Sequence, residues 1–294
     1  MKRYLAVWMA LIVIVGRDLT TTNRAVNWTG PYDPFPSQPP LAAIQADAPA
    51  SAIFRLHSEQ RLPGHAACAA DFNEVGGITP IRVTPYADFL QNVPRDVRWQ
   101  LLNVRYLVTW RDSVDDHFGQ PVDVTRLAQQ GDGKDATYTY RLNQDHPRAW
   151  IVHEVETEPD RQSIYTALAA PGFDPRRVAY TQSPVSVVTS QATEPVSITI
   201  PDPQRIVVDA DPATPGLLVL SEVNYPGWMA IVNGAAAPIV EVNGLLRGIV
   251  LPAGPARAEM IFRPLSLVAG GILTIVGWIV WLVLIIWGKR RTRV

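Results

Sequence analysis

The densest run of chemically active side chains is Asp112-Ser113-Val114-Asp115-Asp116-His117, which follows a predicted strand over residues 104–110. Carboxylate oxygens are the ligands that hard divalent cations prefer, so Asp115 and Asp116 are candidate metal ligands. The competing interpretation, which we favour, is a solvated loop at the end of the strand. The five histidines are scattered, and none stands at metal-ligand spacing from another, so no further residue supports a metal site.

A second polar and aromatic group consists of Tyr225, Trp228, Asn243 and Arg247. Sugar rings stack their C–H faces on aromatic side chains while neighbouring polar groups bind the hydroxyls, so this group is a candidate glycan site. Against this stands the position of Trp228 at the start of a predicted strand, where tryptophan commonly fills the core between two sheets. We favour the core position for Trp228.

Linear motifs for catalysis are missing from the chain. It contains no phosphate-binding loop, no dinucleotide-binding fingerprint, no nucleophile elbow and no zinc-protease motif. We therefore predict neither a catalytic residue nor a cofactor. An enzyme site assembled from distant segments stays open as an alternative, with Asp116 and His117 as the residues to test.

The C-terminal part of the chain is typical of a membrane protein. Residues 265–287 form a run of 23 residues without a charged side chain. A helix of that length spans about 34 Å, against roughly 30 Å for the hydrocarbon core of a bilayer. Residues 288–294 hold four basic residues and no acid, which predicts a cytoplasmic tail by the positive-inside rule.

The N-terminal segment, residues 1–17, begins with Lys2 and Arg3 and continues with 13 residues, 4–16, that carry no charge. Three interpretations fit it: a signal peptide, a short uncleaved anchor, or the end of a longer transmembrane helix. All three place the residues between the two apolar segments outside the cytoplasm.

The formal net charge of −1 conceals an uneven distribution. Six of the 26 basic residues lie in the two terminal segments, which leaves 20 basic against 27 acidic residues for the rest of the chain. A nucleic-acid-binding protein would present positive charge on a folded face, so we expect no nucleic-acid partner. The single cysteine, Cys68, excludes an intramolecular disulfide, and stability must come from core packing.

Between the apolar ends, the sequence pattern divides into three parts. Residues 18–50 are rich in proline and predict an extended segment. Residues 51–181 mix strand and helix patterns, which predicts an extracytoplasmic α+β domain. Residues 182–264 alternate apolar and polar side chains between turn signals such as Asn233-Gly234 and Asn243-Gly244. This pattern predicts an all-β sandwich of immunoglobulin-like size.

Several stretches together resemble the extracytoplasmic C-terminal part of YfhO-type bacterial membrane proteins. These stretches are Tyr32–Pro36, Phe72–Gly77, Leu101–Thr109, Pro147–Trp150, Asn224–Trp228 and Val242–Gly254. Their order and spacing cover roughly residues 17–287 and end in a last membrane helix. The chain departs from the family at two positions. Asn233 stands before Gly234 where the family commonly has an aspartate, and Pro255-Ala256 follows Gly254 where the family commonly has a histidine.

The resemblance implies a link to large multi-spanning proteins of the GT-C glycosyltransferase type, which add sugars from polyprenyl-phosphate carriers to cell-envelope polymers. The family's many membrane helices, with the loop expected to hold its catalytic acid, precede the part matched here, so no catalytic residue carries over.

We therefore expect a binding or positioning part that is anchored in the bacterial cytoplasmic membrane, with its main domain extracytoplasmic and its C-terminus cytoplasmic. The partners implied are the lipid bilayer, an envelope glycan or polyprenyl-linked sugar, and a multi-spanning membrane protein. A free-standing envelope binding or scaffold protein is the alternative.

Overall fold

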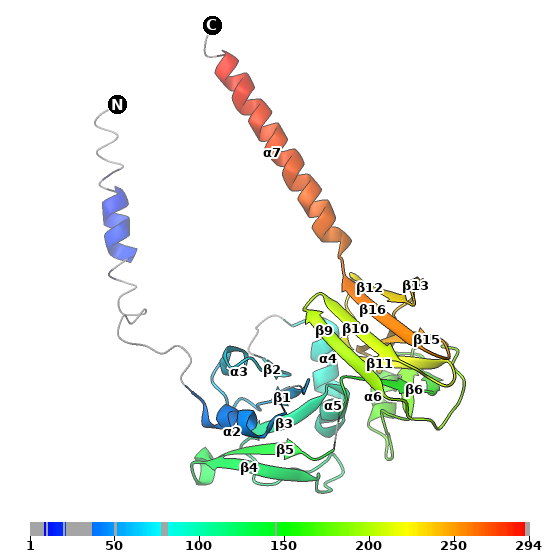
Figure 1. Ribbon diagram of the computed structural model, residues 1–294. Helices are drawn as coiled ribbons and strands as arrows, with labels where there is room; N and C mark the ends of the chain where they lie inside the picture. The colour runs from blue at the N-terminus through cyan, green and yellow to red at the C-terminus, as the bar shows by residue number, and fades with distance from the viewer. Residues whose placement is uncertain are drawn as a thin grey trace. The chain divides into compact units, whose positions relative to one another are not determined.

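The computed structural model describes residues 9, 11–19, 21, 37–49, 52–77, 82–144 and 146–291. The chain divides into two compact units, Met1–Gln38 and Pro39–Val294. In the first unit, residues 11–19 are helical and exposed. The second unit holds the four sheets and the C-terminal helix (Figure 1). The segments predicted over residues 1–17 and 18–50 lie in part outside the described residues.

One part of the expected extended segment is instead a helix, α2 (Pro39–Asp47). Its two prolines occupy the first turn, where the missing N–H groups would have no helical partner in any case. Leu41 and Ile44 lie three residues apart on one helical face and are buried. The prediction of extended chain was therefore wrong for these residues, because burial of one helical face outweighs the proline content.

The first sheet has five strands in the order β2-β1-β3-β5-β4. Its strands are β1 (Arg55–His57), β2 (Asn73–Glu74), β3 (Val104–Thr109), β4 (Val124–Gln130) and β5 (Thr137–Leu142). β1 pairs in parallel with both β2 and β3, whereas β5 is antiparallel to β3 and β4. Parallel neighbours need crossover connections, and helices of this region lie in those connections.

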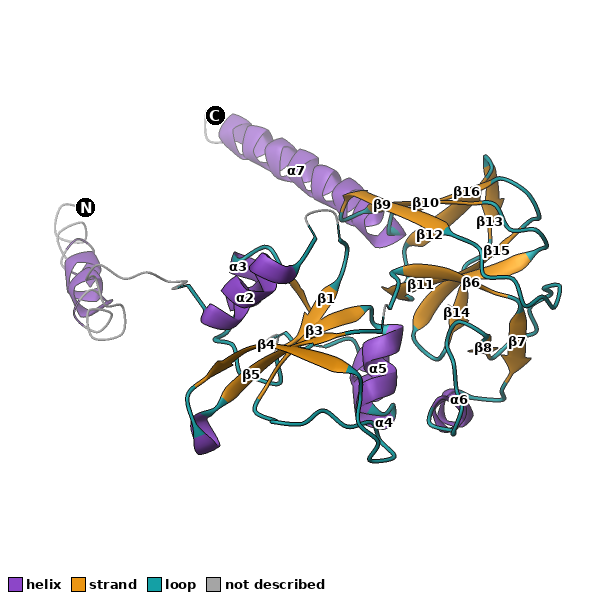
Figure 2. Ribbon diagram, turned by 60° about the horizontal axis from the view of Figure 1, so that its bottom comes forward, coloured by secondary structure: helices purple, strands orange, loops and turns teal. Residues whose placement is uncertain are grey.

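Helices cover both faces of this sheet (Figure 2). They are α2, α3 (Ala66–Ala69), α4 (Thr84–Asn92) and α5 (Arg95–Leu101). α2 and α3 pack with Leu56 and Tyr106 in one apolar cluster, and α4 and α5 pack with Leu107 in another. Adjacent strand residues point to opposite faces, which is why Tyr106 and Leu107 enter different clusters. Mixed helices and strands are thus confirmed for this region.

Two antiparallel sheets follow, in the orders β13-β12-β16-β10-β9 and β14-β15-β11-β6. Their strands are β6 (Ala149–Val152), β9 (Val196–Asp202), β10 (Arg205–Ala210), β11 (Gly216–Val223), β12 (Trp228–Val232), β13 (Ala235–Ala237), β14 (Val240–Val242), β15 (Leu246–Leu251) and β16 (Ala256–Phe262). Side chains from both sheets form one core, which includes Leu218, Ile249 and Met260. The strand order differs from that of an immunoglobulin domain, because the last strand, β16, lies inside its sheet rather than at an edge.

The four-stranded sheet is buried on both faces. Along β11, Leu218 and Leu220 belong to the core between the two sheets. Leu217 and Val219 instead pack in the cluster that holds α4, α5 and helix α6 (Arg161–Leu168). A small parallel pair, β7 (Glu154–Thr157) and β8 (Val178–Thr181), lies beside them. Because β6 comes from the preceding region of the chain, the residues expected as two domains, 51–181 and 182–264, share one core.

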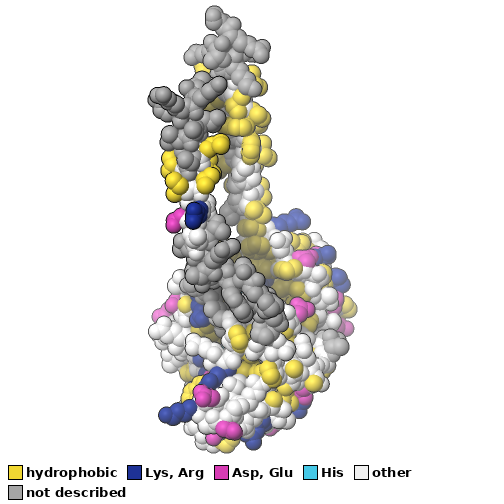
Figure 3. Space-filling view, turned by 90° about the vertical axis from the view of Figure 1, so that its left-hand side faces the viewer, with side chains coloured by type: hydrophobic (Ala, Val, Ile, Leu, Met, Phe, Trp, Pro, Cys, Tyr) yellow, Lys and Arg dark blue, Asp and Glu magenta, His cyan; other side chains and the backbone are white. Residues whose placement is uncertain are grey.

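The C-terminal helix α7 runs from Leu265 to Arg291. Its segment Leu265–Trp287 is long and apolar enough to span a membrane, and none of the most apolar window is buried inside the protein. Figure 3 shows its hydrophobic side chains in yellow. A core helix would have its apolar side chains covered by the rest of the chain, so exposure on all sides favours a membrane-spanning segment.

Candidate functional site

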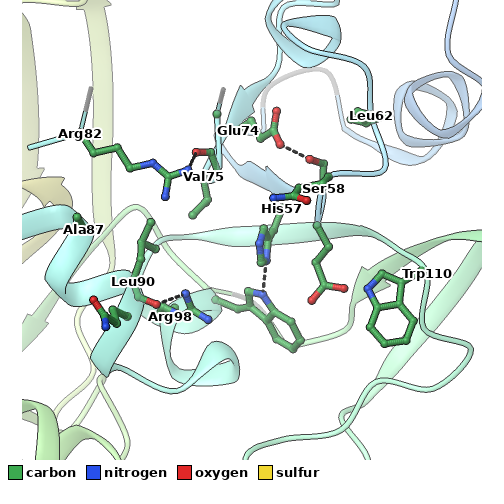
Figure 4. A pocket seen from close by; sticks show the side chains of 16 residues that line it. His57, Ser58, Leu62, Glu74, Val75, Arg82, Ala87, Leu90, Arg98 and Trp110 are labelled. Atoms are coloured by element: carbon green, nitrogen blue, oxygen red, sulfur yellow. Dashed lines mark hydrogen bonds between the residues drawn. The ribbon is translucent and has the colours of Figure 1, made fainter. Parts of the chain in front are cut away.

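A cavity of about 1160 Å³ lies at the carboxyl ends of β1, β2 and β3 (Figure 4). Three stretches that follow these strands line it: residues 58–60 after β1, residues 75–77 after β2, and Trp110 after β3. Side chains of α4 and α5, among them Leu90 and Arg98, form a further part of the wall. We call this cavity the strand-end cleft.

The strand order explains why a cavity forms here. β1 lies between β2 and β3, so the chain leaves β1 toward β2 on one side and returns to β3 on the other. Loops that leave parallel strands in opposite directions diverge and open a crevice at the carboxyl ends, which is where α/β proteins bind their ligands. The fold itself therefore provides a binding position at the strand-end cleft.

His57, the last residue of β1, lines the cleft with a fixed ring tautomer. Trp99 Nε1 donates a hydrogen bond to His57 Nδ1 over 2.9 Å. Because Nδ1 accepts this bond, the proton of the neutral ring sits on Nε2. Burial lowers the pKa of His57 from 6.5 to about 4. His57 is therefore a neutral hydrogen-bond donor at ordinary pH.

Two carboxylates in the cleft are held in place by neighbouring side chains. Glu74 Oε1 accepts a hydrogen bond from the Ser58 hydroxyl. Glu59 Oε2 accepts one from Thr109 Oγ1, and Glu59 Oε1 lies 3.5 Å from Arg95 Nη1. A carboxylate has about four acceptor positions, so both groups retain capacity to accept hydrogen bonds from a ligand.

The turn after β1 has an uncommon backbone. Glu59 and Gln60 have φ angles of 38° and 62°, in the left-handed region that non-glycine residues rarely occupy. Such conformations cost about 1–3 kcal/mol each, persist only where the surrounding structure holds them, and cluster at ligand sites. Both residues line the cleft, which is a second reason to regard it as functional.

Arg82 and Arg98 supply positive charge to the wall of the cleft. Arg82 Nη2 donates to the Gly76 carbonyl over 3.2 Å. Arg98 Nη1 donates to the Leu90 carbonyl over 2.5 Å, whereas its buried Nε has no hydrogen-bond partner among the described residues. The described lining thus holds two arginines and two glutamates, and its charges balance.

Trp110 gives the cleft an exposed aromatic surface. Its side chain is 50% exposed, and the guanidinium carbon of Arg111 lies 4.3 Å from the ring centre. Trp99, by contrast, is buried and takes part in the wall through its bond to His57. Balanced charge, a neutral imidazole donor, fixed acceptors and an open indole ring suit a neutral, hydroxyl-rich ligand better than an ion.

The structure places Asp115 and Asp116 in a loop outside this cleft. Asp116 Oδ1 accepts hydrogen bonds from the backbone N–H groups of Phe118 and Gln120, both over 2.8 Å. Asp115 Oδ2 accepts one from Ser113 Oγ over 3.2 Å. Within the described ranges, no three metal-binding side chains come together. These contacts agree with the favoured interpretation as a loop, in which Asp116 fixes the turn.

His117, next to Asp116, is tied to α5. Its Nδ1 lies 2.9 Å from Asp96 Oδ2, and its Nε2 lies 3.1 Å from the carbonyl oxygen of Ala169. Burial alone would lower the pKa of His117, but the bonds to Asp96 and Ala169 outweigh it and the pKa is raised. Both ring nitrogens of His117 are therefore engaged, and the side chain joins this loop to α5 and to Ala169.

The second predicted group is only partly brought together. Tyr225, Trp228 and Arg247 line a groove of about 330 Å³ beside the end of β16. The guanidinium carbon of Arg247 lies 3.8 Å from the Trp228 ring centre and covers one face of the ring. Trp228 is half-buried at the edge of the core between the sheets. Asn243 is fully buried and accepts a hydrogen bond from the Tyr180 N–H, so it cannot contact a ligand in the groove.

The cleft could not be predicted from a motif, because its lining comes from four separate stretches: residues 57–62, 74–77, 82–99 and Trp110. The one available signal was the alternation of short strands and helices, from which parallel pairing and a strand-end crevice follow. Comparison of the chain with protein-family models, curated proteins and solved structures found no match. The assignment of function therefore rests on the geometry of the cleft and on the sequence itself.

Proposed function

We propose that this chain is a membrane-anchored extracytoplasmic module that binds carbohydrate in the strand-end cleft. The observation that carries the proposal is the lining of the cleft, where an exposed indole ring stands beside hydrogen-bonding groups of balanced charge. Carbohydrates present apolar C–H faces and hydroxyl groups together, and this lining is complementary to both.

The cleft offers a sugar both hydrogen-bond acceptors and hydrogen-bond donors. Hydroxyl groups both donate and accept, so a sugar can donate to the carboxylates of Glu59 and Glu74 and accept from His57 Nε2 and Arg98. The ring of Trp110 offers the stacking surface. Because His57 stays neutral down to about pH 4, recognition through it does not change between pH 6 and 8.

The resemblance to YfhO-type proteins supports an envelope glycan as the ligand and the bacterial cytoplasmic membrane as the location. In this proposal α7 anchors the module with its basic end in the cytoplasm. The module then binds or positions an acceptor glycan, or a polyprenyl-linked sugar, for a multi-spanning membrane partner.

The test is a calorimetric titration of the full chain, reconstituted in nanodiscs, with teichoic-acid and polysaccharide fragments. We expect saturable binding, and Trp110→Ala should weaken it about tenfold, which corresponds to about 1.4 kcal/mol. Phe118→Ala is the matched control, since Phe118 is also 50% exposed but lies outside the cleft. Lack of binding at millimolar glycan, or an equal loss in both variants, would favour a scaffold role instead.

A further inference from the structure

A buried group of charges lies beside the groove formed by Tyr225, Trp228 and Arg247. Its centre is Glu222 of β11, whose Oε1 accepts a hydrogen bond from Arg148 Nε over 2.8 Å. Arg55 Nη2 lies 3.4 Å from the same oxygen, and Arg247 Nη2 lies 3.7 Å from Oε2. We call Glu222 and these three arginines, Arg55, Arg148 and Arg247, the arginine cluster.

Positive charge exceeds negative charge in the arginine cluster. Three guanidinium groups share one carboxylate, and Arg148 and Arg247 are only 9% and 2% exposed. Burial lowers the pKa of Arg55 and of Arg247, each to about 10, so both remain protonated at neutral pH. Buried charge without a counter-charge is unfavourable, and a bound anion would compensate it.

The members of the cluster differ in how well their donors are used. Arg55 Nη1 donates to the carbonyls of Leu102 and Ser221 over 3.0 and 2.8 Å. Arg247 Nε donates to the Val223 carbonyl over 3.1 Å, and its Nη1 donates to Met260 Sδ, a weak acceptor, over 3.8 Å. Arg247 Nη1 is therefore less well satisfied than Arg55 Nη1, and Arg247 is the arginine of the cluster that lines the groove.

The groove also lies close to the predicted membrane segment. Phe262, which lines it, stands three residues before Leu265, where the apolar span of α7 begins. Three extended residues cover at most about 10 Å, so Phe262 lies within that distance of Leu265, the first residue of the span. The backbone N–H of Arg263 donates to the Gly227 carbonyl over 2.7 Å, which holds the Tyr225 loop against this connection.

The rim of the groove is apolar and exposed. Tyr225 and Val83 are 47% and 43% exposed and both line the groove, and Met229 of the neighbouring strand β12 is 49% exposed. Exposed aromatic and apolar side chains next to the start of a membrane-spanning segment are typical of surfaces that contact lipid headgroups and the first carbons of the acyl chains. Charge and apolar surface thus coincide at the point where the chain reaches α7.

We propose that this groove binds the phosphate headgroup of an anionic phospholipid, with Arg247 as the cationic contact and the apolar rim against the lipid body. Glu222 also lines the groove, but its oxygens are engaged by the arginines of the cluster. The site rests on membrane anchoring through α7 and is independent of carbohydrate binding in the strand-end cleft.

The experiment incubates the full chain in detergent with an equimolar mixture of phosphatidylglycerol and phosphatidylcholine and counts the retained lipids by native mass spectrometry. We expect enrichment of phosphatidylglycerol on the unmodified chain. Val83→Glu places a carboxylate at the mouth of the groove without disturbing the core, and should lower the ratio of the two retained lipids about fivefold. Arg247→Gln, if it folds, should lower the ratio as well.

Val188→Glu is the matched control, because Val188 is 48% exposed, receives the same charge change and lies outside the groove. The basic residues after Trp287 attract anionic lipid equally in both variants. A difference in lipid ratio between Val83→Glu and Val188→Glu therefore comes from the groove. An equal lipid ratio for the two glutamate variants would overturn the proposal. Displacement of phosphatidylglycerol by millimolar inorganic phosphate would also overturn it, since the groove would then take a soluble anion.

Discussion

The first, mixed sheet and the two antiparallel sheets use polar residues in different ways. In the first, strands end in loops, and polar side chains such as Glu59 and Glu74 line an open cleft. In the second, β11 is covered on both faces, and its polar residues Ser221 and Glu222 are bound by arginines. A polar group at a strand end reaches a ligand, whereas one inside a covered sheet needs a protein partner.

The arginine cluster joins these two regions of the molecule. Arg55 belongs to β1 of the first sheet, yet it donates to the Ser221 carbonyl of β11. Arg148 and Arg247 meet the same part of β11 from other segments of the chain. We therefore expect large stability effects for substitutions in the covered sheet and at this junction. In the cleft we expect mainly binding effects, apart from the effect of His57 protonation on stability.

The largest effect is expected at the junction. Glu222→Ala removes the carboxylate shared by three buried arginines and should cost about 3–5 kcal/mol, because uncompensated charge stays behind. Asp209→Ala is the control, since the pair of Asp209 with Arg257 is more than half exposed and should contribute at most about 1 kcal/mol. Chemical unfolding of the full chain in detergent measures both, and similar losses would contradict the comparison.

A pH dependence of similar size is expected from the cleft. His57 has a pKa of about 4 in the folded chain and 6.5 when unfolded, so the unfolded state binds the proton first as the pH falls. Stability should decrease between pH 6.5 and 4 by up to about 3 kcal/mol. The measurement is the unfolding midpoint at several pH values in this range. The decrease should be absent from His57→Gln, and an equally steep decrease in that variant would show that His57 does not cause it.

His117 should act in the opposite sense. Its pKa is raised in the folded chain, so the stability that it contributes is complete below pH 6.5 and is lost as the pH rises through the folded pKa. His117→Gln should therefore flatten the alkaline side of the same profile.

A smaller effect compares the same substitution in the two regions. In Gly248→Ala of β15, the added Cβ would overlap Val242 and approach Leu217 Cδ1 to 3.0 Å, so overpacking should cost about 1–3 kcal/mol. In Gly76→Ala at the cleft, the nearest atom is Glu74 Oε1 at an ordinary 3.6 Å, and we expect a change below about 0.5 kcal/mol. Equal free energies of unfolding for the two variants would show that the covered sheet is no tighter than the cleft.

Sequence patterns predicted the elements that depend on a single segment. The apolar span over Leu265–Trp287 has the predicted bounds, and β3 (Val104–Thr109) lies within the strand predicted over residues 104–110. The Asn233-Gly234 turn has positive φ at both residues and joins β12 to β13 as a hairpin. In each case local propensity and burial period act in the same direction, so no distant contact is needed to decide the outcome.

Elements decided by distant contacts could not be predicted in the same way. α2 forms because Leu41 and Ile44 pack against the first sheet, although its prolines favour extended chain. β6 pairs with β11 across about 65 residues, which no local pattern indicates. The cleft and the arginine cluster likewise join side chains from separate segments, and their residue types become informative only when the strand order is known.

Hydroxyl-radical footprinting of the full chain, with and without an envelope glycan, shows whether the strand-end cleft is the carbohydrate site. We expect the glycan to protect Trp110 and the peptides that contain residues 57–62 and 74–77, while Tyr225 and Trp228 keep their reactivity. Protection of Tyr225 and Trp228 with an unprotected Trp110 would instead place the carbohydrate site in the groove beside β16.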